Sequence, residues 1–123
     1  MTPTYIKIDG VPYGQAKARG DLNAPVKWTE AIISQTRSLP KVKEACIVKL
    51  TFLLPLDKFP KDYPYGSDLD NLLKRFMDAL NETIFSDAAG KDSCILSITA
   101  SKAKVNDKKQ AGALLEVLPV SVA

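Results

Sequence analysis

The sequence contains no histidine, and this absence removes several kinds of catalytic site. Imidazole is the usual general base near neutral pH, a member of the Ser-His-Asp triad and a common zinc ligand. Any hydrolysis by this chain must therefore depend on carboxylates, lysine and a hard metal ion.

Cysteine is also scarce, because the chain has only Cys46 and Cys94. Each of them falls in an apolar, strand-like run, where cysteine usually serves as a small core residue. We therefore expect two core thiols and not a disulfide or a metal pair. The one tryptophan, Trp28, falls among the apolar positions of a helical pattern, so we expect it in the core and not stacked on a base.

No apolar run is long enough to cross a membrane, and the first residues lack the apolar segment of a signal peptide. We therefore expect no membrane partner and a cytoplasmic location. At 123 residues, the chain can bury one hydrophobic core but not two, so residues 1–123 are expected to form a single domain.

The net charge of +3 is unevenly distributed. Residues 1–61 carry ten bases and five acids, residues 62–92 carry three and seven, and residues 93–123 carry four and two. The balances of these segments are therefore +5, −4 and +2. An acidic segment between basic flanks suits a metal-dependent site on a polyanion, because carboxylates hold the cation while lysine and arginine bind phosphates.

Hydrophobic periodicity predicts an α+β domain. Apolar residues alternate in four segments and recur at helical spacing in two others. Their order favours one mixed sheet of about four strands with two main helices packed on one face. The clearest strand should lie near the centre of the sheet, and the third should place Cys94, Leu96, Ile98 and Ala100 on one face. The expected strands are residues 4–8, 44–54, 93–102 and 113–118, and the expected helices are residues 25–38 and 69–80.

The start of the second expected helix holds the most informative residues. Asp68 and Asp70 fall in or just before its first turn, and Lys74 follows Asp70 by four residues on the same side of the helix. Two carboxylates and a cation in this arrangement indicate a metal and phosphate site. The simpler interpretation is that Ser67 or Asp68 caps the helix and that acids in the first turn interact favourably with the helix dipole. The pattern alone leaves both interpretations open.

A longer motif contains these residues. It consists of Asp68-Leu-Asp70-Asn-Leu-Leu-Lys74, Asp78-Ala-Leu, Asp92-Ser-Cys-Ile and Lys102, preceded near the start of the chain by Gly10-Val-Pro12, Lys17 and Arg19. Over almost the whole chain, this motif resembles the RusA family of Holliday-junction endonucleases.

The resemblance implies a RusA-like fold and a Mg2+-dependent homodimer, with Mn2+ able to substitute. Members of the RusA family recognise branched DNA, four-way junctions in particular, and nick two strands symmetrically in recombination and repair. This role would place the chain near the nucleoid. Asp68 and Asp70 would bind the metal, and Lys74 would be catalytic. The third ligand is carried over to Asp92, because an apolar strand follows it directly, with Asp87 as the reserve. The bases expected to contact DNA are Lys17, Arg19, Lys58, Lys61 and Lys102.

Two questions remain open from the sequence. The chain is either an active endonuclease or a DNA-binding module of the same fold that has lost cleavage, and its retained acids and lysine favour the enzyme. The second question is how Asp92 reaches the other acids, since a helix of residues 69–80 is roughly 18 Å long. The connector of residues 81–91 can span roughly 30 Å when extended. We expect it to run back along the helix, so that Asp92 joins its own subunit's pair; the alternative is a site shared with the dimer partner.

Overall fold

The structure is a computed structural model that describes residues 3–14, 23–59, 61–62 and 64–120. Six main elements follow one another along the chain: β1 (Thr4–Asp9), α1 (Ala24–Thr36), β2 (Cys46–Pro55), α2 (Leu69–Leu80), β3 (Ile95–Val105) and β4 (Gly112–Pro119). Short 3-10 turns precede β3 and β4 and follow β2. The expected α+β class, the four strands and the two helices are therefore confirmed.

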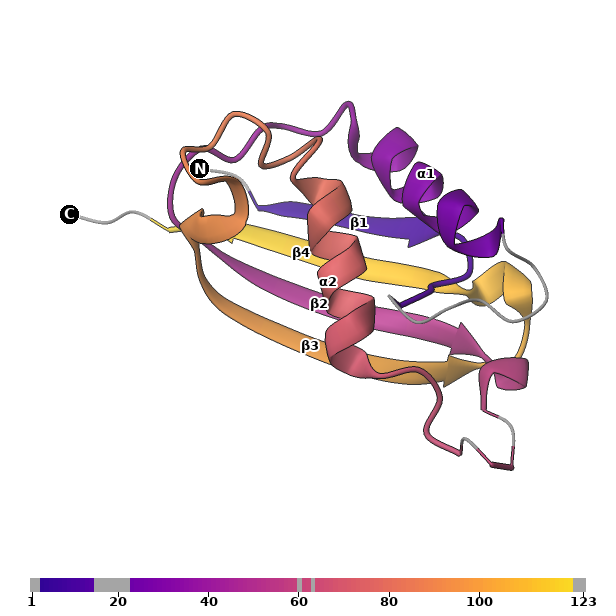
Figure 1. The fold of residues 1–123 in the computed structure, drawn as a ribbon. Coiled ribbons are helices and arrows are strands. Elements are labelled where there is room, and N and C mark those ends of the chain that lie inside the picture. Colours follow the sequence, from indigo (N-terminus) through magenta and orange to yellow (C-terminus); the bar gives the residue numbers. More distant parts are fainter. Residues whose placement is uncertain (1–2, 15–22, 60, 63, 121–123) are drawn as a thin grey trace.

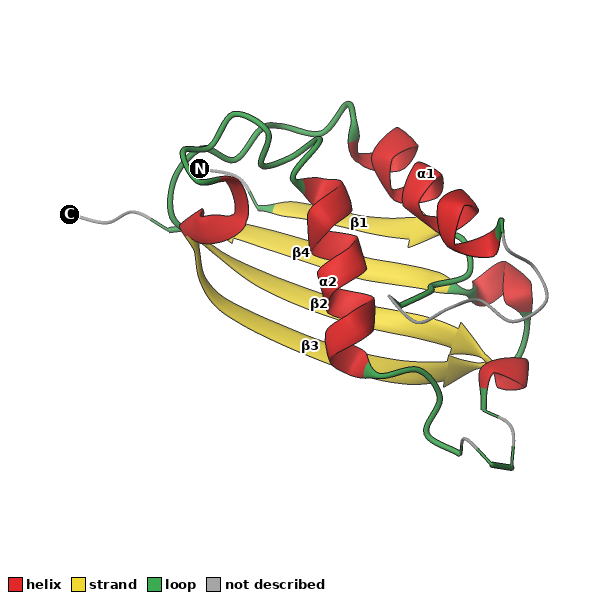
Figure 2. Cartoon of the chain, viewed as in Figure 1, coloured by secondary structure: helices red, strands yellow, loops and turns green. Residues whose placement is uncertain are grey.

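The four strands form one mixed sheet in the order β1-β4-β2-β3. β4 pairs antiparallel with both β1 and β2, whereas β2 and β3 are parallel. Both helices cover the same face of this sheet, and α2 crosses over the strands at an angle (Figures 1 and 2). β2 is an inner strand, as its continuous alternation of apolar residues predicted.

The core lies between the sheet and the two helices. Phe52 of β2 and Phe76 of α2 are fully buried and meet edge to face, with ring centroids 5.7 Å apart. Trp28 of α1 is 1% exposed and lies 6.1 Å from the Phe76 ring, so the expectation that it is a core residue is confirmed. Cys46 is buried, Cys94 packs partly buried against the core, and both thiols are free.

The edge strand β3 differs from the sequence expectation. Its register shifts opposite Cys46 and Ile47, so that Ile95 and Ser97 are the paired residues and Leu96 falls in a bulge. Leu96 is 62% exposed and Ile98 is 38% exposed. The expectation that Leu96 shares one face with Cys94, Ile98 and Ala100 is wrong, because the bulge at Leu96 interrupts the regular alternation of side chains.

Within the described residues, none of the helices combines the length and the apolar character needed to span a bilayer.

Candidate metal and nucleic-acid site

The start of α2 is defined by a turn and by a strongly one-sided helix. Gly66 has a left-handed backbone (φ +73°), and Asp68 then occupies the N-cap position in an extended conformation. Every third or fourth residue along α2 is apolar and buried, which fixes the rotation of the helix on the sheet. The buried residues are Leu72, Phe76, Met77, Ala79 and Leu80.

This rotation leaves both acids of the first turn in solvent. Asp68 and Asp70 are exposed, and neither carboxylate makes a hydrogen bond or an ion pair with any residue that the structure describes. Asp68 is the N-cap residue, but its side chain makes no capping hydrogen bond. The capping interpretation therefore does not account for Asp68, and two exposed carboxylates at the start of one helix remain available to a ligand.

Lys74 lies one turn beyond Asp70 and is also exposed. Within the described residues its ammonium group makes no ion pair, not even with Asp70. The expectation that Lys74 and Asp70 share one edge of the helix agrees with their positions in α2. The absence of a bond between them leaves the ammonium free for an anion that binds beside the acids.

Asp92 lies at the opposite end of α2. Its backbone N–H donates to Oδ1 of Asn81, the residue that ends the helix, with the two atoms 3.1 Å apart. Twelve helical residues separate Asp68 from Asn81, a length of about 18 Å. No group of three or more acidic, cysteine or histidine side chains suited to a metal occurs among the described residues of one chain.

The expectation that the connector returns to the start of α2 is therefore wrong. Residues 81–90 form successive turns instead of an extended segment, and Thr83, Ile84 and Phe85 in these turns are buried at the end of the helix. The backbone of Val42 also bonds to Ile84, with N and O 2.8 Å apart. Burial of Ile84 and Phe85 holds the connector in place, so Asp92 lies beside the helix C-terminus, in the 3-10 turn of Lys91–Cys94 that precedes β3. Asp87, the reserve ligand, is exposed in the same connector.

The bases expected to contact DNA have different surroundings. Lys17 and Arg19 lie outside the described residues. Lys58 donates to the Tyr13 hydroxyl at 2.7 Å and lies 4.0 Å from the centre of its ring. Lys61 is exposed. Lys102 points to the start of α2 from β3, where its ammonium donates to the backbone oxygens of Tyr65 and Ser67.

One comparison with known proteins bears on this arrangement. The family model of endodeoxyribonuclease RusA matches residues 22–117, which include α2, Asp92 and Lys102. This chain belongs to the RusA family. No curated protein matches the chain. RusA proteins are Holliday-junction resolvases of DNA recombination, and nucleases of this kind generally depend on a divalent metal. The chain is accordingly an endodeoxyribonuclease that binds branched DNA.

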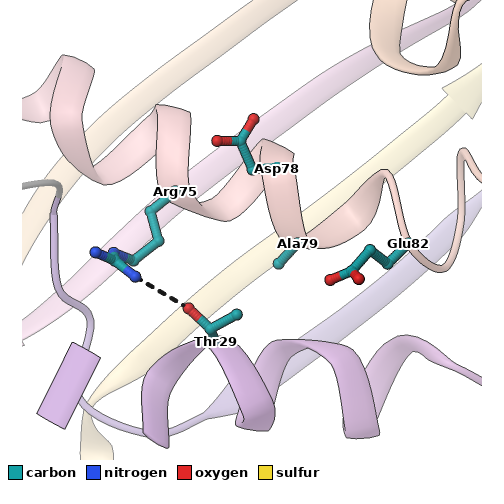
Figure 3. A pocket seen from close by; sticks show the side chains of 5 residues that line it. All are labelled: Thr29, Arg75, Asp78, Ala79 and Glu82. Atoms are coloured by element: carbon teal, nitrogen blue, oxygen red, sulfur yellow. Dashed lines mark hydrogen bonds between the residues drawn. The ribbon is translucent and has the colours of Figure 1, made fainter. Parts of the chain in front are cut away.

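Sequence reasoning missed one residue that joins α2 to the first loop and to α1. Arg75 adjoins Lys74 and reaches from α2 to α1, where Nη1 donates to Oγ1 of Thr29 at 3.2 Å (Figure 3). Its Nε donates to the backbone oxygen of Gly14 at 2.8 Å, which ties the first loop to α2. A Cβ on Gly14 would lie 3.0 Å from Cβ of Asn71, so a larger residue at this position would require the loop or the helix to shift.

Arg75 also lines a hollow of about 160 Å³ between the two helices, together with Asp78 and Glu82. Figure 3 shows Arg75 directed at Thr29 and Asp78 directed away from α1. The hollow begins more than one turn beyond Asp70 along α2, and neither Asp68 nor Asp70 lines it. No signal in the sequence distinguishes Arg75 from other helix bases, because its partners are 46 and 61 residues away.

Proposed function

We propose that residues 1–123 act as a single RusA endonuclease domain that resolves four-way DNA junctions by paired symmetric nicks, in a Mg2+-dependent reaction carried out by a homodimer. The observation that carries this proposal is the start of α2. Two exposed carboxylates, Asp68 and Asp70, have no partner among the described residues, and the unpaired ammonium of Lys74 lies one turn away.

The donor set suits magnesium. Mg2+ prefers oxygen ligands, retains several waters and is usually held by one or two carboxylates together with substrate phosphate. Asp68 and Asp70 would supply these carboxylates, and Mn2+ would substitute because it accepts similar ligands. When bound, the metal supplies polarisation of the scissile phosphate and a lowered pKa for a bound water.

Lys74 is proposed to stabilise the negative charge that develops on the phosphate during cleavage. A preorganised cation at the reacting group is worth roughly a hundredfold or more in rate. Its freedom from Asp70 supports this role, because an ammonium engaged in an ion pair would offer less charge to the phosphate.

Four of the five expected bases are proposed to hold the DNA backbone, whereas the ammonium of Lys102 is engaged with the backbone oxygens of Tyr65 and Ser67. Lys61 is exposed and free to contact phosphate, whereas Lys58 would contribute from its position over Tyr13. Lys17 and Arg19 are proposed for the same role from their place in the glycine-rich first loop. Phosphate contacts position the enzyme but do not read bases, so they favour recognition of DNA shape.

The third metal ligand is proposed to be Asp92 of the partner subunit. The distance between the two ends of α2 supports this assignment, because no single subunit brings Asp92 to Asp68. Within the described residues β3 pairs only with β2, so its other edge is free for a second copy of the chain.

Antiparallel association of two β3 edges, one from each subunit, would bring Asp92 of one subunit towards Asp68 of the other. It would bring the start of each β3, which follows the 3-10 turn that contains Asp92, beside the end of the other β3, where Lys102 contacts the turn before Asp68. A two-fold axis makes both contacts equivalent, so each subunit would donate the ligand that it receives.

A cleavage assay tests the proposed activity. A synthetic four-way junction carried on a plasmid should be cut by the wild-type chain with Mg2+ but not with EDTA, and paired nicks should yield linear DNA. Asp70→Asn should bind the junction without cutting it. Binding of the junction by the wild-type chain with no cleavage in Mg2+ or Mn2+ would instead identify a DNA-binding module that has lost activity.

A further inference from the structure

The side chain of Lys102 joins β3 to the turn that precedes α2. Its Nζ donates to the backbone oxygen of Tyr65 at 2.6 Å and to that of Ser67 at 2.8 Å. These partners are 37 and 35 residues away along the chain, and Lys102 is half-buried between them and the sheet. Hydrogen bonds from an ammonium group are stronger than those between neutral groups.

Gly66 makes this double contact possible. It lies between the two acceptors with φ +73°, a left-handed conformation in which glycine is favoured. A Cβ at this position would lie 3.0 Å from Cε1 of Phe59 and 3.2 Å from the backbone oxygen of Lys58. The turn is therefore packed on one side by Phe59 and bonded by Lys102 through both flanking carbonyls.

The two hydrogen bonds of Lys102 clamp the turn of residues 65–67, which ends directly before Asp68. Because the Asp68 side chain makes no capping bond, its direction depends on the backbone on either side. On the helix side, the backbone oxygen of Asp68 accepts from the N–H of Leu72 at 3.1 Å. On the other side, the Ser67 carbonyl is fixed by Lys102.

We infer that Lys102 is a positioning residue of the metal site, which holds the turn of residues 65–67 so that Asp68 and Asp70 face one ligand. This inference rests on the proposed function for the ligand's identity, but the clamp itself does not depend on catalysis. Two of the three N–H groups of the ammonium are donated to the protein's own backbone, which leaves little donor capacity for a DNA phosphate.

Lys104 provides a matched control. It lies two residues further along β3, and its Nζ is 4.7 Å from the centre of the Phe59 ring, but it bonds neither Tyr65 nor Ser67. Lys104→Met therefore removes the same charge from the same strand and leaves the clamp intact. A difference between Lys102→Met and Lys104→Met reports the two hydrogen bonds.

The first experiment measures NMR order parameters of the amides of Gly66, Ser67 and Asp68 in the metal-free chain. A rigid backbone gives about 0.85 and a flexible one below about 0.6. Lys102→Met should lower these values towards the flexible range, whereas Lys104→Met should leave them unchanged. Equal values in wild type and Lys102→Met would overturn the inference. Should Lys102→Met not fold, Lys102→Arg takes its place: with its donors retained, the turn should stay ordered, and a disordered turn in that variant would also overturn the inference.

The second experiment separates positioning from phosphate binding. Lys102→Met should lower turnover at saturating junction at least tenfold and raise the Mg2+ concentration needed for half-maximal cleavage, while metal-free junction affinity changes less than twofold. Loss of a phosphate contact would instead reduce the slope of log affinity against log salt by about 0.9 and leave turnover unchanged; that result would overturn the inference. If the wild-type chain does not cleave at all, the proposed function fails, and the order parameters still decide the role of Lys102.

Discussion

Replacement of Lys74 by alanine should separate catalysis from folding. Lys74 is exposed in the middle of α2 and makes no ion pair with the described residues. An exposed substitution of this kind changes the free energy of unfolding by no more than about 0.5 kcal/mol. The melting temperature should therefore move by less than about 3 °C.

Lys74→Ala should reduce the rate of cleavage far more than it reduces stability. If Lys74 stabilises charge on the reacting phosphate, its loss should lower kcat roughly a hundredfold, which corresponds to about 2.7 kcal/mol at 1.36 kcal/mol per factor of ten. The measurement is single-turnover cleavage of a labelled four-way junction at saturating enzyme, alongside thermal unfolding of the same preparations.

Lys27→Ala is the matched control, because Lys27 is an exposed lysine in α1, a different helix from the one that carries Asp70 and Lys74. It should show the same small change in melting temperature and wild-type cleavage. The reasoning about Lys74 is refuted if Lys74→Ala cleaves within threefold of the control, or if its loss of activity follows an equal loss of stability.

Two further results are expected. Asp68→Asn and Asp70→Asn should each abolish cleavage while junction binding in a gel-shift assay stays intact or becomes tighter, because they remove a ligand charge and not a basic contact; wild-type cleavage by either variant would refute its role as a ligand. Burial, with a smaller effect of neighbouring Cys94, raises the pKa of the Cys46 thiol from 9.0 to about 12. Because the pKa is raised in the folded state, this thiol contributes full stability below pH 9 and loses it as the pH rises towards 12. Denaturant titrations from pH 9 towards 12 should show a smaller decline in unfolding free energy for Cys46→Ala than for the wild type. An identical decline in both proteins would contradict the role of this thiol.

The sequence predicted those parts of the fold that are set by local periodicity. The bounds of α2 agree with its apolar stripe from Leu69 to Leu80, because one-sided burial of a helix is visible at a spacing of three and four residues. The inner position of β2 followed from its alternation, and burial of Trp28 followed from its place on the apolar side of α1.

The position of Asp92 was not predictable in the same way. Chain length sets only the greatest distance that the connector can span, and an extended connector would have reached the start of α2. Burial of Ile84 and Phe85 at the end of the helix decided otherwise. Such tertiary packing does not appear in the periodicity of a connector that is neither helix nor strand.

The site residues also fall into a local group, which the sequence predicts, and a long-range group, which it does not. Asp68, Asp70 and Lys74 are close in sequence and share one helix, so their proximity could be predicted from helical geometry. Lys102 and Arg75 act across 35 to 61 residues, through backbone oxygens that carry no sequence signature. Their contacts become visible only when the sheet and helices are assembled.

The most direct test of the account is a mixed dimer. An Asp70→Asn chain and an Asp92→Asn chain with different affinity tags are co-expressed, and heterodimers are isolated through both tags. If each metal site combines acids of two subunits, the heterodimer has one intact site and one site with both lesions. It should then nick a four-way junction in one strand with Mg2+, although both mutant homodimers are inactive. A heterodimer as inactive as the homodimers would contradict the shared site, because each site of an unshared pair carries one lesion.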